Sequence, residues 1–339
     1  MNIILFFFAT CSALIINYIF NKNRLFLNSN GDDHQKFTLS TSVPLSGGLI
    51  LILTSYYYLN LSNLIFIFFI YCIFFIGFLS DINKINSPKK RLIIQLVIIF
   101  AVVYFSSIMV STTRLILLDR LLENKTFQIF FTIFCILVIV NGCNFMDGVN
   151  TSLLGYCLII SSVLHYLNLS GIEVSKIINF YNMIPVLSAL FILNFFNKLY
   201  LGDGGSYLLG LLFSLCLINT HQINNSISPF FIACLLWYPA YENLFSILRK
   251  VKFSRSPINP DTNHLHQLIF FHLKKIFNVH NIYLNTFSGI IVNFYNLMSI
   301  LIAVQFYNNT KVQVFVIMFN VSFYTLVYNK LLQKKIKKT

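Results

Sequence analysis

Five side chains that can do chemistry stand out in a chain that is otherwise mostly apolar. Asp203 lies among glycines in LYLGDGGSYLLG, Asp81 follows GFLS, and Asp147 nearly closes NGCNFMDG. His264 and His266 form an H-x-H pair in the stretch NPDTNHLHQ. Carboxylates are costly near a membrane core and are usually functional where they are kept. The glycines on both sides of Asp203 indicate a tight bend or a close approach to a ligand.

The chemistry that these residues favour is the binding of phosphate groups with a metal ion. Carboxylates and amides near glycine-rich turns are hard oxygen ligands for Mg²⁺, which commonly bridges substrate phosphates. Lys and Arg side chains nearby hold phosphate charge. The two histidines would suit zinc, but the sequence offers no third or fourth zinc ligand beside them. We therefore expect a transferase that acts on a lipid phosphate and on a second phosphorylated substrate.

The elements that position these residues are expected to be membrane-spanning helices. The 339 residues are 57% hydrophobic and only 10% charged, unlike a soluble domain. A span needs about 20 apolar residues, and the first one lacks the features of a cleaved signal peptide. We predict an all-α, polytopic integral membrane protein with ten to eleven spans, at 3–20, 44–60, 63–80, 91–110, 127–141, 151–168, 179–196, 205–220, 228–247, 285–305 and 312–331.

The basic residues predict the orientation of these spans. With the N-terminus outside, 19 of the 24 Lys and Arg residues fall on the cytoplasmic side, together with the three aspartates and both histidines. We therefore predict a cytoplasmic-face active site in a bacterial cytoplasmic (inner) membrane. The net charge of +14 is then explained by the orientation of the spans and by attraction to anionic headgroups. Nucleic acid is not an expected partner.

The chain is predicted to be a single transmembrane domain, residues 1–339, that ends in a basic cytoplasmic tail at 331–339. Its seven cysteines contain no C-x-x-C pair, so neither a disulfide nor a cysteine metal site is expected. Self-association as a homodimer is compatible with this organisation.

An ordered set of motifs resembles the polyprenyl-phosphate N-acetylhexosamine-1-phosphate transferase family. The motifs are SVPLSGG, GFLSDINK with SPKKRLIIQ, NGCNFMDG, LYLGDGGSYLLG, and PAYENLFSILRK with SPINPDTNHLHQLI, and they cover residues 34–270. The family transfers sugar 1-phosphate from a UDP-sugar to a polyprenyl phosphate and releases UMP, with Mg²⁺ or in its place Mn²⁺. The resemblance thus implies transfer of N-acetylhexosamine-1-phosphate to undecaprenyl phosphate, initiating O-antigen, capsule or teichoic acid.

The resemblance also implies roles for single residues. Asp203 and Asp81 are expected to be catalytic, and Asp203 with Asn144 to hold the metal. The residues expected to bind the nucleotide sugar are Tyr200, Asp147, Gly148, Asn150, His264 and His266. The residues expected to bind the phosphate groups, including that of the lipid, are Lys36, Lys84 and Arg91.

Three positions depart from the family pattern. Ser80 stands where an aspartate usually precedes Asp81, Gln267 replaces the last histidine of H-x-H-H, and Asn150 replaces an aspartate of many bacterial members. The phosphate monoester of the lipid carries about −1.5 to −2 charge at neutral pH and can attack without a strong base. Because Asp203, Asp147, Asn144 and both histidines are retained, an inactive member is the less favoured interpretation.

Two other functions remain open from the sequence. One is phospho-MurNAc-pentapeptide translocase activity, although the H-H-H-F-E stretch of that enzyme is absent. The other is a membrane transporter, since transporters also carry acids within spans. Glu242 fits a proton relay in that case, but a structural partner for a loop arginine or a helix end is the favoured interpretation.

Overall fold

Helices make up nearly all of the part of the chain that the structure describes. This computed structural model describes residues 2–27, 43–60, 62, 64–252 and 263–336. Two isolated bridges, Leu27 with Pro44 and Leu59 with Ile178, are the β-structure among these residues. The helices are α1 (Ile3–Asn23), α2 (Gly47–Tyr58), α3 (Leu64–Asp81), α4 (Pro88–Ser106), α5 (Ile116–Leu122), α6 (Lys125–Met146), α7 (Ser152–Leu169), α8 (Phe180–Phe195), α9 (Gly202–Ile223), α10 (Pro229–Leu235), α11 (Trp237–Lys252), α12 (Leu265–Ile276), α13 (Asn281–Gln305) and α14 (Thr310–Ile336).

Each of the eleven predicted spans coincides with a helix, or with the bent pair α10 and α11. In lipid the backbone must satisfy its own hydrogen bonds, so a continuous apolar stretch folds as a helix. Polar residues mark the starts: Ser87 caps α4 before a proline, Asn124 caps α6, and Asn179 caps α8. A side-chain oxygen at that position accepts a backbone N–H that has no partner within the helix.

The number of helices that meet a strict criterion for crossing a membrane is smaller than the predicted number. Seven of the described helices are long and apolar enough, or eight if α10 and α11, which meet at 73°, form one span. The helices α2 and α8 are shorter than the bilayer core requires, at 12 and 16 residues, and α4 opens with three basic residues. The chain is a multi-pass membrane protein by these helices, and the count of ten to eleven spans stays a prediction.

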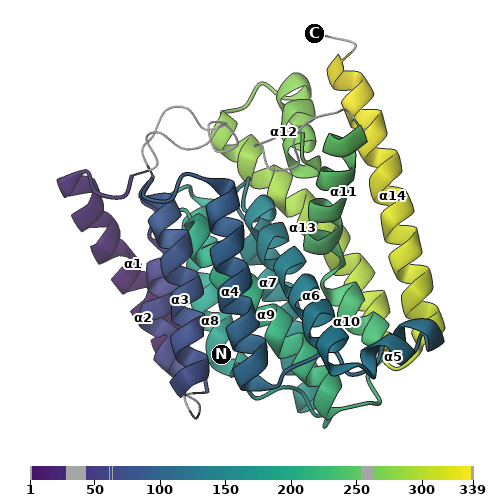
Figure 1. The fold of residues 1–339 in the computed structure, drawn as a ribbon. Coiled ribbons are helices and arrows are strands. Elements are labelled where there is room, and N and C mark those ends of the chain that lie inside the picture. Colours follow the sequence, from purple (N-terminus) through teal and green to yellow (C-terminus); the bar gives the residue numbers. More distant parts are fainter. Residues whose placement is uncertain (1, 28–42, 61, 63, 253–262, 337–339) are drawn as a thin grey trace.

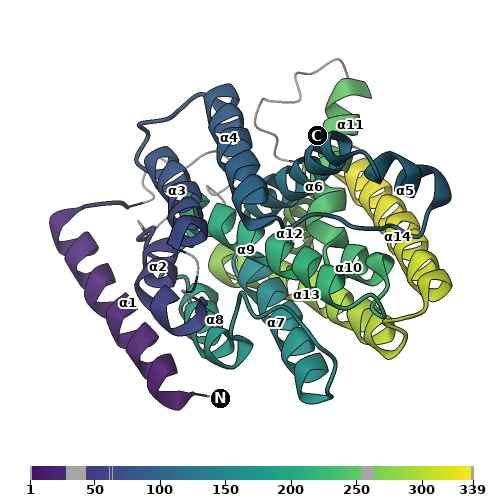
Figure 2. The same cartoon turned by 60° about the horizontal axis from the view of Figure 1, so that its bottom comes forward.

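The centre of the bundle is α9. Within its apolar stretch 83% of the residues are buried, against 28% in α1 and 22% in α14. The helices α1 and α14 lie at opposite edges of the bundle (Figures 1 and 2). Glycines let neighbouring backbones touch α9: a Cβ at Gly77 of α3 would lie 2.4 Å from the amide nitrogen of Gly204, and one at Gly210 would lie 2.8 Å from the Cα of Val140 on α6. Close approach at small residues is how helices pack in membranes.

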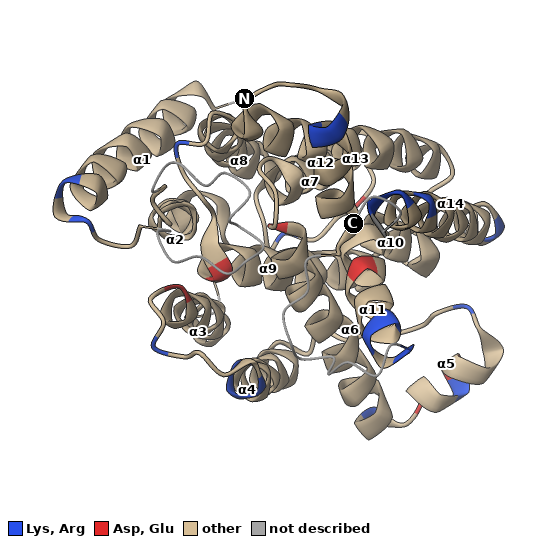
Figure 3. Cartoon of the chain, turned by 90° about the horizontal axis from the view of Figure 1, so that it is seen from above, with Lys and Arg blue, Asp and Glu red and all other residues tan. Residues whose placement is uncertain are grey.

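One end of the bundle collects many of the basic residues. Lys22 lies in the last turn of α1, Lys334 and Lys335 lie in the last turn of α14, and Lys89 and Lys90 open α4. Figure 3 looks onto this end and shows basic segments on these helices. The clustering agrees with the predicted sidedness, while the cytoplasmic orientation itself stays a prediction.

Two helices were missed by the sequence analysis, and one extends further than expected. The helix α5 has only 7 residues, and α12 is an amphipathic helix of 12 residues, too short for the span criterion. The helix α14 continues to Ile336, so most of the predicted tail at 331–339 is helical. Residues 337–339 of that tail lie outside the described residues.

Candidate active site

The glycines around Asp203 build a helix start. Gly202 has a φ of +78°, which an L side chain adopts only with strain, and it begins α9. Asp203 is the second residue of the helix, where the backbone N–H groups have no partner within the helix. A carboxylate is stabilised there by the helix dipole. The loop therefore turns sharply at Gly202 so that an acid stands at the positive end of the central helix.

Asp81 satisfies the free N–H groups of this helix start from another helix. Its Oδ1 accepts a hydrogen bond from the backbone nitrogen of Asp203 at 2.8 Å, and its Oδ2 accepts one from Gly204 at 3.1 Å. A Cβ on Gly202 would lie 2.6 Å from the same Oδ2. Asp81 thus acts as a cap supplied by α3, and this contact fixes where Asp203 stands.

The carboxylate of Asp203 is the centre of a polar cluster. Asn144 donates to its Oδ1 at 2.6 Å, and both Ser80 and Arg91 donate to its Oδ2 at 2.7 Å. Arg91 also donates to the Ser80 hydroxyl at 2.6 Å. Ser206, one turn along α9, accepts from Asn144 at 3.1 Å. Four elements thereby hold one carboxylate: the ends of α3 and α6, and the beginnings of α4 and α9.

These residues fit a magnesium ion better than a transition metal. No group of three His, Cys, Asp or Glu side chains that could hold a metal occurs among the described residues. Mg²⁺ is commonly bound through one or two carboxylates, with water and substrate phosphates completing its shell. The side chain of Asp203 is 20% exposed, so one side of the carboxylate is open. The amide of Asn144 donates through its nitrogen, which leaves its oxygen for a cation.

The residues expected to bind the nucleotide lie together beside this cluster. Asp147, Gly148, Asn150 and Tyr200 line one narrow pocket. Tyr200 is held by its backbone, whose nitrogen donates to the carbonyl oxygen of Pro44 at 2.9 Å. The Asn150 side chain is buried and donates to Asn197 at 3.1 Å, and that buried bond reduces its freedom to meet a ligand.

Asp147 follows the last residue of α6, and its carboxyl group lies in a low-dielectric environment. Burial raises the pKa of its carboxyl well above the usual range, and the negative charges of Asp203 and Asp81 raise it further. A carboxyl that keeps its proton can donate a hydrogen bond to a ligand oxygen. Asp147 therefore differs in character from Asp203, whose carboxylate accepts three hydrogen bonds.

The two histidines lie against the segment that carries Asn144 and Asp147. The ring of His264 is 5.0 Å from that of Phe145 and stacks on His266 with an interplanar angle of 3°. A Cβ on Gly148 would lie 2.6 Å from Nε2 of His266, so the glycine leaves room for that ring. Gln267 accepts a hydrogen bond from the backbone nitrogen of His264 at 3.1 Å. Gln267, which departs from the H-x-H-H pattern, therefore supplies a hydrogen-bond acceptor for the start of α12.

The three predicted phosphate-binding residues have different outcomes. Lys84 is exposed in the turn after α3, and no hydrogen bond or ion pair joins its ammonium group to another described residue. Lys36 lies outside the described residues. Arg91 is the predicted basic residue that the structure brings to Asp203.

Two site residues escaped the sequence analysis as contributors, and a third was expected to have partly different partners. Ser80 was noted as a departure but not as a partner of Asp203, and Ser206 was not noted, although its place one turn after Asp203 is a signal. Glu242 was noted as a structural partner for a loop arginine or a helix end. Its contact with the backbone nitrogen of Leu265 at the start of α12 agrees with the second alternative, and its other partners are His264 and Tyr324.

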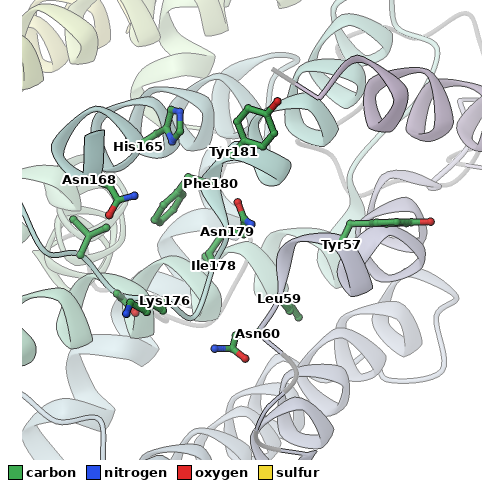
Figure 4. Close-up of a pocket in the computed structure, with 12 residues that line it drawn as sticks. Tyr57, Leu59, Asn60, His165, Asn168, Lys176, Ile178, Asn179, Phe180 and Tyr181 are labelled. Atoms are coloured by element: carbon green, nitrogen blue, oxygen red, sulfur yellow. The ribbon is translucent and has the colours of Figure 1, made fainter. Parts of the chain in front are cut away.

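A separate cavity lies at the opposite end of the helices. It has a volume of about 450 Å³ and is lined by residues from the ends of α2 and α7 and from the segment leading into α8, among them Tyr57, Asn60, His165, Lys176 and Tyr181 (Figure 4). None of the predicted site residues that the structure describes lines this cavity. The predicted chemistry therefore belongs to the other end of the bundle.

The comparisons with known proteins concern the middle of the chain. The sequence model of glycosyl transferase family 4 matches residues 63–221. The chain is 26% identical to the undecaprenyl-phosphate alpha-N-acetylglucosaminyl 1-phosphate transferase of Escherichia coli (strain K12) over 190 residues, which are 54% of this chain and 52% of that protein. It is 30% identical to the probable undecaprenyl-phosphate N-acetylglucosaminyl 1-phosphate transferase of Bacillus subtilis (strain 168) over 162 residues, 45% of this chain and 44% of that protein.

The chain spans about half the length of the curated relatives that it matches. The family match runs from α3 through most of α9, so it includes all five residues of the Asp203 cluster. The helices α11, α12 and α14, with both histidines, lie beyond it. The stretch that matches the sequence model of glycosyl transferase family 4, residues 63–221, carries the whole hydrogen-bonded cluster around Asp203.

Proposed function

We propose that this protein transfers N-acetylhexosamine-1-phosphate, most simply GlcNAc-1-phosphate, from a UDP-sugar to undecaprenyl phosphate. The observation that carries the proposal is the partly open carboxylate of Asp203 at the start of α9, held by Asn144 and Arg91. The activities for which the relatives are named suggest the lipid acceptor and the sugar.

The reaction is an in-line displacement at phosphorus. A phosphate oxygen of the lipid attacks the β-phosphorus of the UDP-sugar and forms the new P–O bond. The bond from that phosphorus to the bridging oxygen breaks, and UMP leaves with the bridging oxygen and its electron pair. The described site offers no separate, activated nucleophile, so direct attack is favoured over a covalent intermediate.

The residues of this chain orient and balance charge in that step. A bound Mg²⁺ would neutralise charge that develops on the phosphates, with Asp203 and the amide oxygen of Asn144 to hold it. Arg91, already at the edge of the carboxylate, is placed to pair with a phosphate oxygen. Asp81 keeps Asp203 at the helix start, while Tyr200 and Asp147 face the nucleotide pocket.

The placement of the acids speaks against the transporter alternative. Asp81 is the last residue of α3, Asp147 follows the last residue of α6, and Asp203 is the second residue of α9. Acids on a conduction path would be expected within the spans. We further propose that this end of the bundle faces the cytoplasm, where a nucleotide sugar is available, and that the lipid-linked product starts a surface polysaccharide.

The proposal is tested with the purified chain in lipid nanodiscs that contain undecaprenyl phosphate. Radiolabelled UDP-GlcNAc and Mg²⁺ are added, and labelled lipid and free UMP are measured. Label in the lipid with equal UMP, lost with EDTA and in Asp203→Asn, would support the proposal. Activity in Asp203→Asn equal to wild type would overturn the assignment of the metal site. No product from UDP-GlcNAc, UDP-GalNAc or other UDP-sugars would overturn the function.

A further inference from the structure

A buried carboxylate ties together three helices beside the histidines. Glu242 of α11 is fully buried, and its Oε1 accepts from Nδ1 of His264 at 2.9 Å and from the backbone nitrogen of Leu265 at 3.4 Å. Its Oε2 accepts from the hydroxyl of Tyr324 on α14 at 2.8 Å. Both oxygens of Glu242 are thus occupied by donors from α12 and α14.

This contact determines which nitrogen of His264 carries a proton. An ionised carboxylate only accepts hydrogen bonds, so the proton must lie on Nδ1 of the histidine. Nε2 is then the ring atom left for a ligand, and it accepts when the ring is neutral and donates when the ring is charged. The ring cannot turn freely, because Phe145 and His266 lie against it.

The groups that face His264 come from each element packed around it. Among the described residues, Glu242 of α11 is the acid that accepts from His264, and Tyr324 contributes a hydroxyl from α14. His266 of α12 stacks on the ring. Phe145 also lies against the ring of His264, and the ammonium of Lys250 is 5.8 Å from the ring centre of Phe145.

The helix α14 also holds the residue that precedes His264. Arg249 donates to the backbone oxygen of Asn263 and to the hydroxyl of Tyr328 on α14. Lys335, near the end of α14, donates to the side chain of Asn263 at 2.7 Å. The start of the histidine segment is therefore fixed by α14 through Asn263 as well as through Glu242.

We propose that Glu242, held by Tyr324, is a positioning residue that sets the tautomer and orientation of His264 for contact with a phosphate group of the substrate. The part played by the phosphate rests on the proposed function, whereas the coupling of Glu242 to His264 does not. The three residues lie beyond the family match. The helix α14 becomes, in this view, a structural support of the active site.

The coupling is tested without any substrate. Histidine C2–H exchange with deuterium, followed by mass spectrometry, gives the pH midpoint for the peptide that contains His264 in the full chain. Removal of a facing carboxylate in Glu242→Gln should lower that midpoint by about one pH unit or more. Tyr324→Phe removes the hydroxyl that donates to Glu242, so the carboxylate interacts more strongly with His264. This variant should therefore raise the midpoint of the His264 peptide.

The matched control is Tyr241→Phe. Tyr241 also joins α11 to α14, through a hydrogen bond of 2.8 Å to Thr325, and its ring lies 4.9 Å from that of Tyr324. Its loss weakens the same helix pair and should leave the midpoint unchanged. Shifts of the same sign in Glu242→Gln, Tyr324→Phe and Tyr241→Phe, or no shift in the first two, would overturn the coupling. If Glu242→Gln does not fold, a raised midpoint in Tyr324→Phe beside an unchanged one in Tyr241→Phe still decides the question.

The catalytic part is tested by transfer kinetics on the same proteins. Loss of a carboxylate that orients a metal-bound histidine commonly costs about 10- to 100-fold, and a similar fall in kcat/KM is expected for Glu242→Gln. Glu242→Asp, which keeps the charge, should recover part of it, and Tyr241→Phe should match wild type. A shifted midpoint with unchanged kinetics in Glu242→Gln would overturn the contact with phosphate. An inactive wild-type chain with the expected midpoints would instead refute the proposed function alone.

Discussion

Replacement of Asp81 separates two roles for this carboxylate. As a cap, it satisfies the backbone nitrogens of Asp203 and Gly204 at the start of α9. As a ligand, it would bind the metal or the lipid phosphate directly, as the sequence analysis allows. Asp81→Asn keeps the shape and one acceptor oxygen but removes the charge, and Asp81→Ala removes both acceptors.

The two variants should lose stability in proportion to the hydrogen bonds removed. A hydrogen bond to a charged group contributes about 1.5–3 kcal/mol. Asp81→Ala loses two of them, about 3–6 kcal/mol, and Asp81→Asn loses about half of that, since its NH₂ group cannot accept. The favourable interaction of a negative charge with the helix start adds about 0.3–1 kcal/mol to both losses.

The assay measures unfolding free energy and metal affinity on the same samples. Unfolding is followed by titration of mixed micelles with SDS, and Mn²⁺ affinity is measured by electron paramagnetic resonance. The cap predicts a stability loss in Asp81→Asn with a Mn²⁺ affinity close to that of wild type. Unchanged stability together with lost Mn²⁺ binding would refute the reasoning. Asp119→Asn is the control, because Asp119 also accepts hydrogen bonds at both oxygens, from Thr112 and Thr113, away from the site.

Three further predictions concern the same architecture. Gly77→Ala should reduce transfer activity at least about 10-fold without abolishing folding, because the new Cβ would lie 2.4 Å from the backbone at the start of α9, and small displacements of a reacting group are costly; wild-type kinetics in this variant would contradict it. Arg91→Met should tighten Mn²⁺ binding measured by resonance, since Arg91 shares Oδ2 of Asp203, and should weaken UDP-sugar binding; looser Mn²⁺ binding would argue against that sharing. Partial burial raises the pKa of Asp119, but hydrogen bonds from Thr113 and other donors outweigh it and leave that pKa below the usual range. The stability from Asp119 is therefore present above its unfolded pKa and lost as the pH falls through the lower folded pKa, so Asp119→Asn should remove that acid limb from unfolding curves.

Much of the architecture could be predicted because lipid leaves few choices to an apolar segment. All eleven apolar stretches coincide with helices or the bent pair, including the two shortest, at 127–141 and 205–220. The break between α10 and α11 was not predicted, although Pro239, which has no backbone N–H to donate to the preceding turn, lies just after it. The helices α5 and α12 escaped because neither is long enough to give a span signal.

The composition of the site could be predicted better than its contacts. Asp203 and Asn144 were expected to act together, and they are hydrogen bonded. That Asp81 caps α9 could not be read from spacing, because the two partners are 122 residues apart and meet only through the packing of α3 on α9. Tyr324, 82 residues from Glu242, carried no signal of its own.

The contact between Asp81 and α9 has a consequence for biogenesis. Asp81 is synthesised 122 residues before Asp203, so the end of α3 reaches the membrane surface well before its partner exists. During that interval its carboxylate stays hydrated at the interface. Insertion of α9 then brings bare N–H groups and the acid of Asp203 to the same place, and docking on α3 satisfies both at once. A nascent chain truncated before α9 should be integrated in the membrane but unable to bind metal, so that assembly of the site follows the order of synthesis.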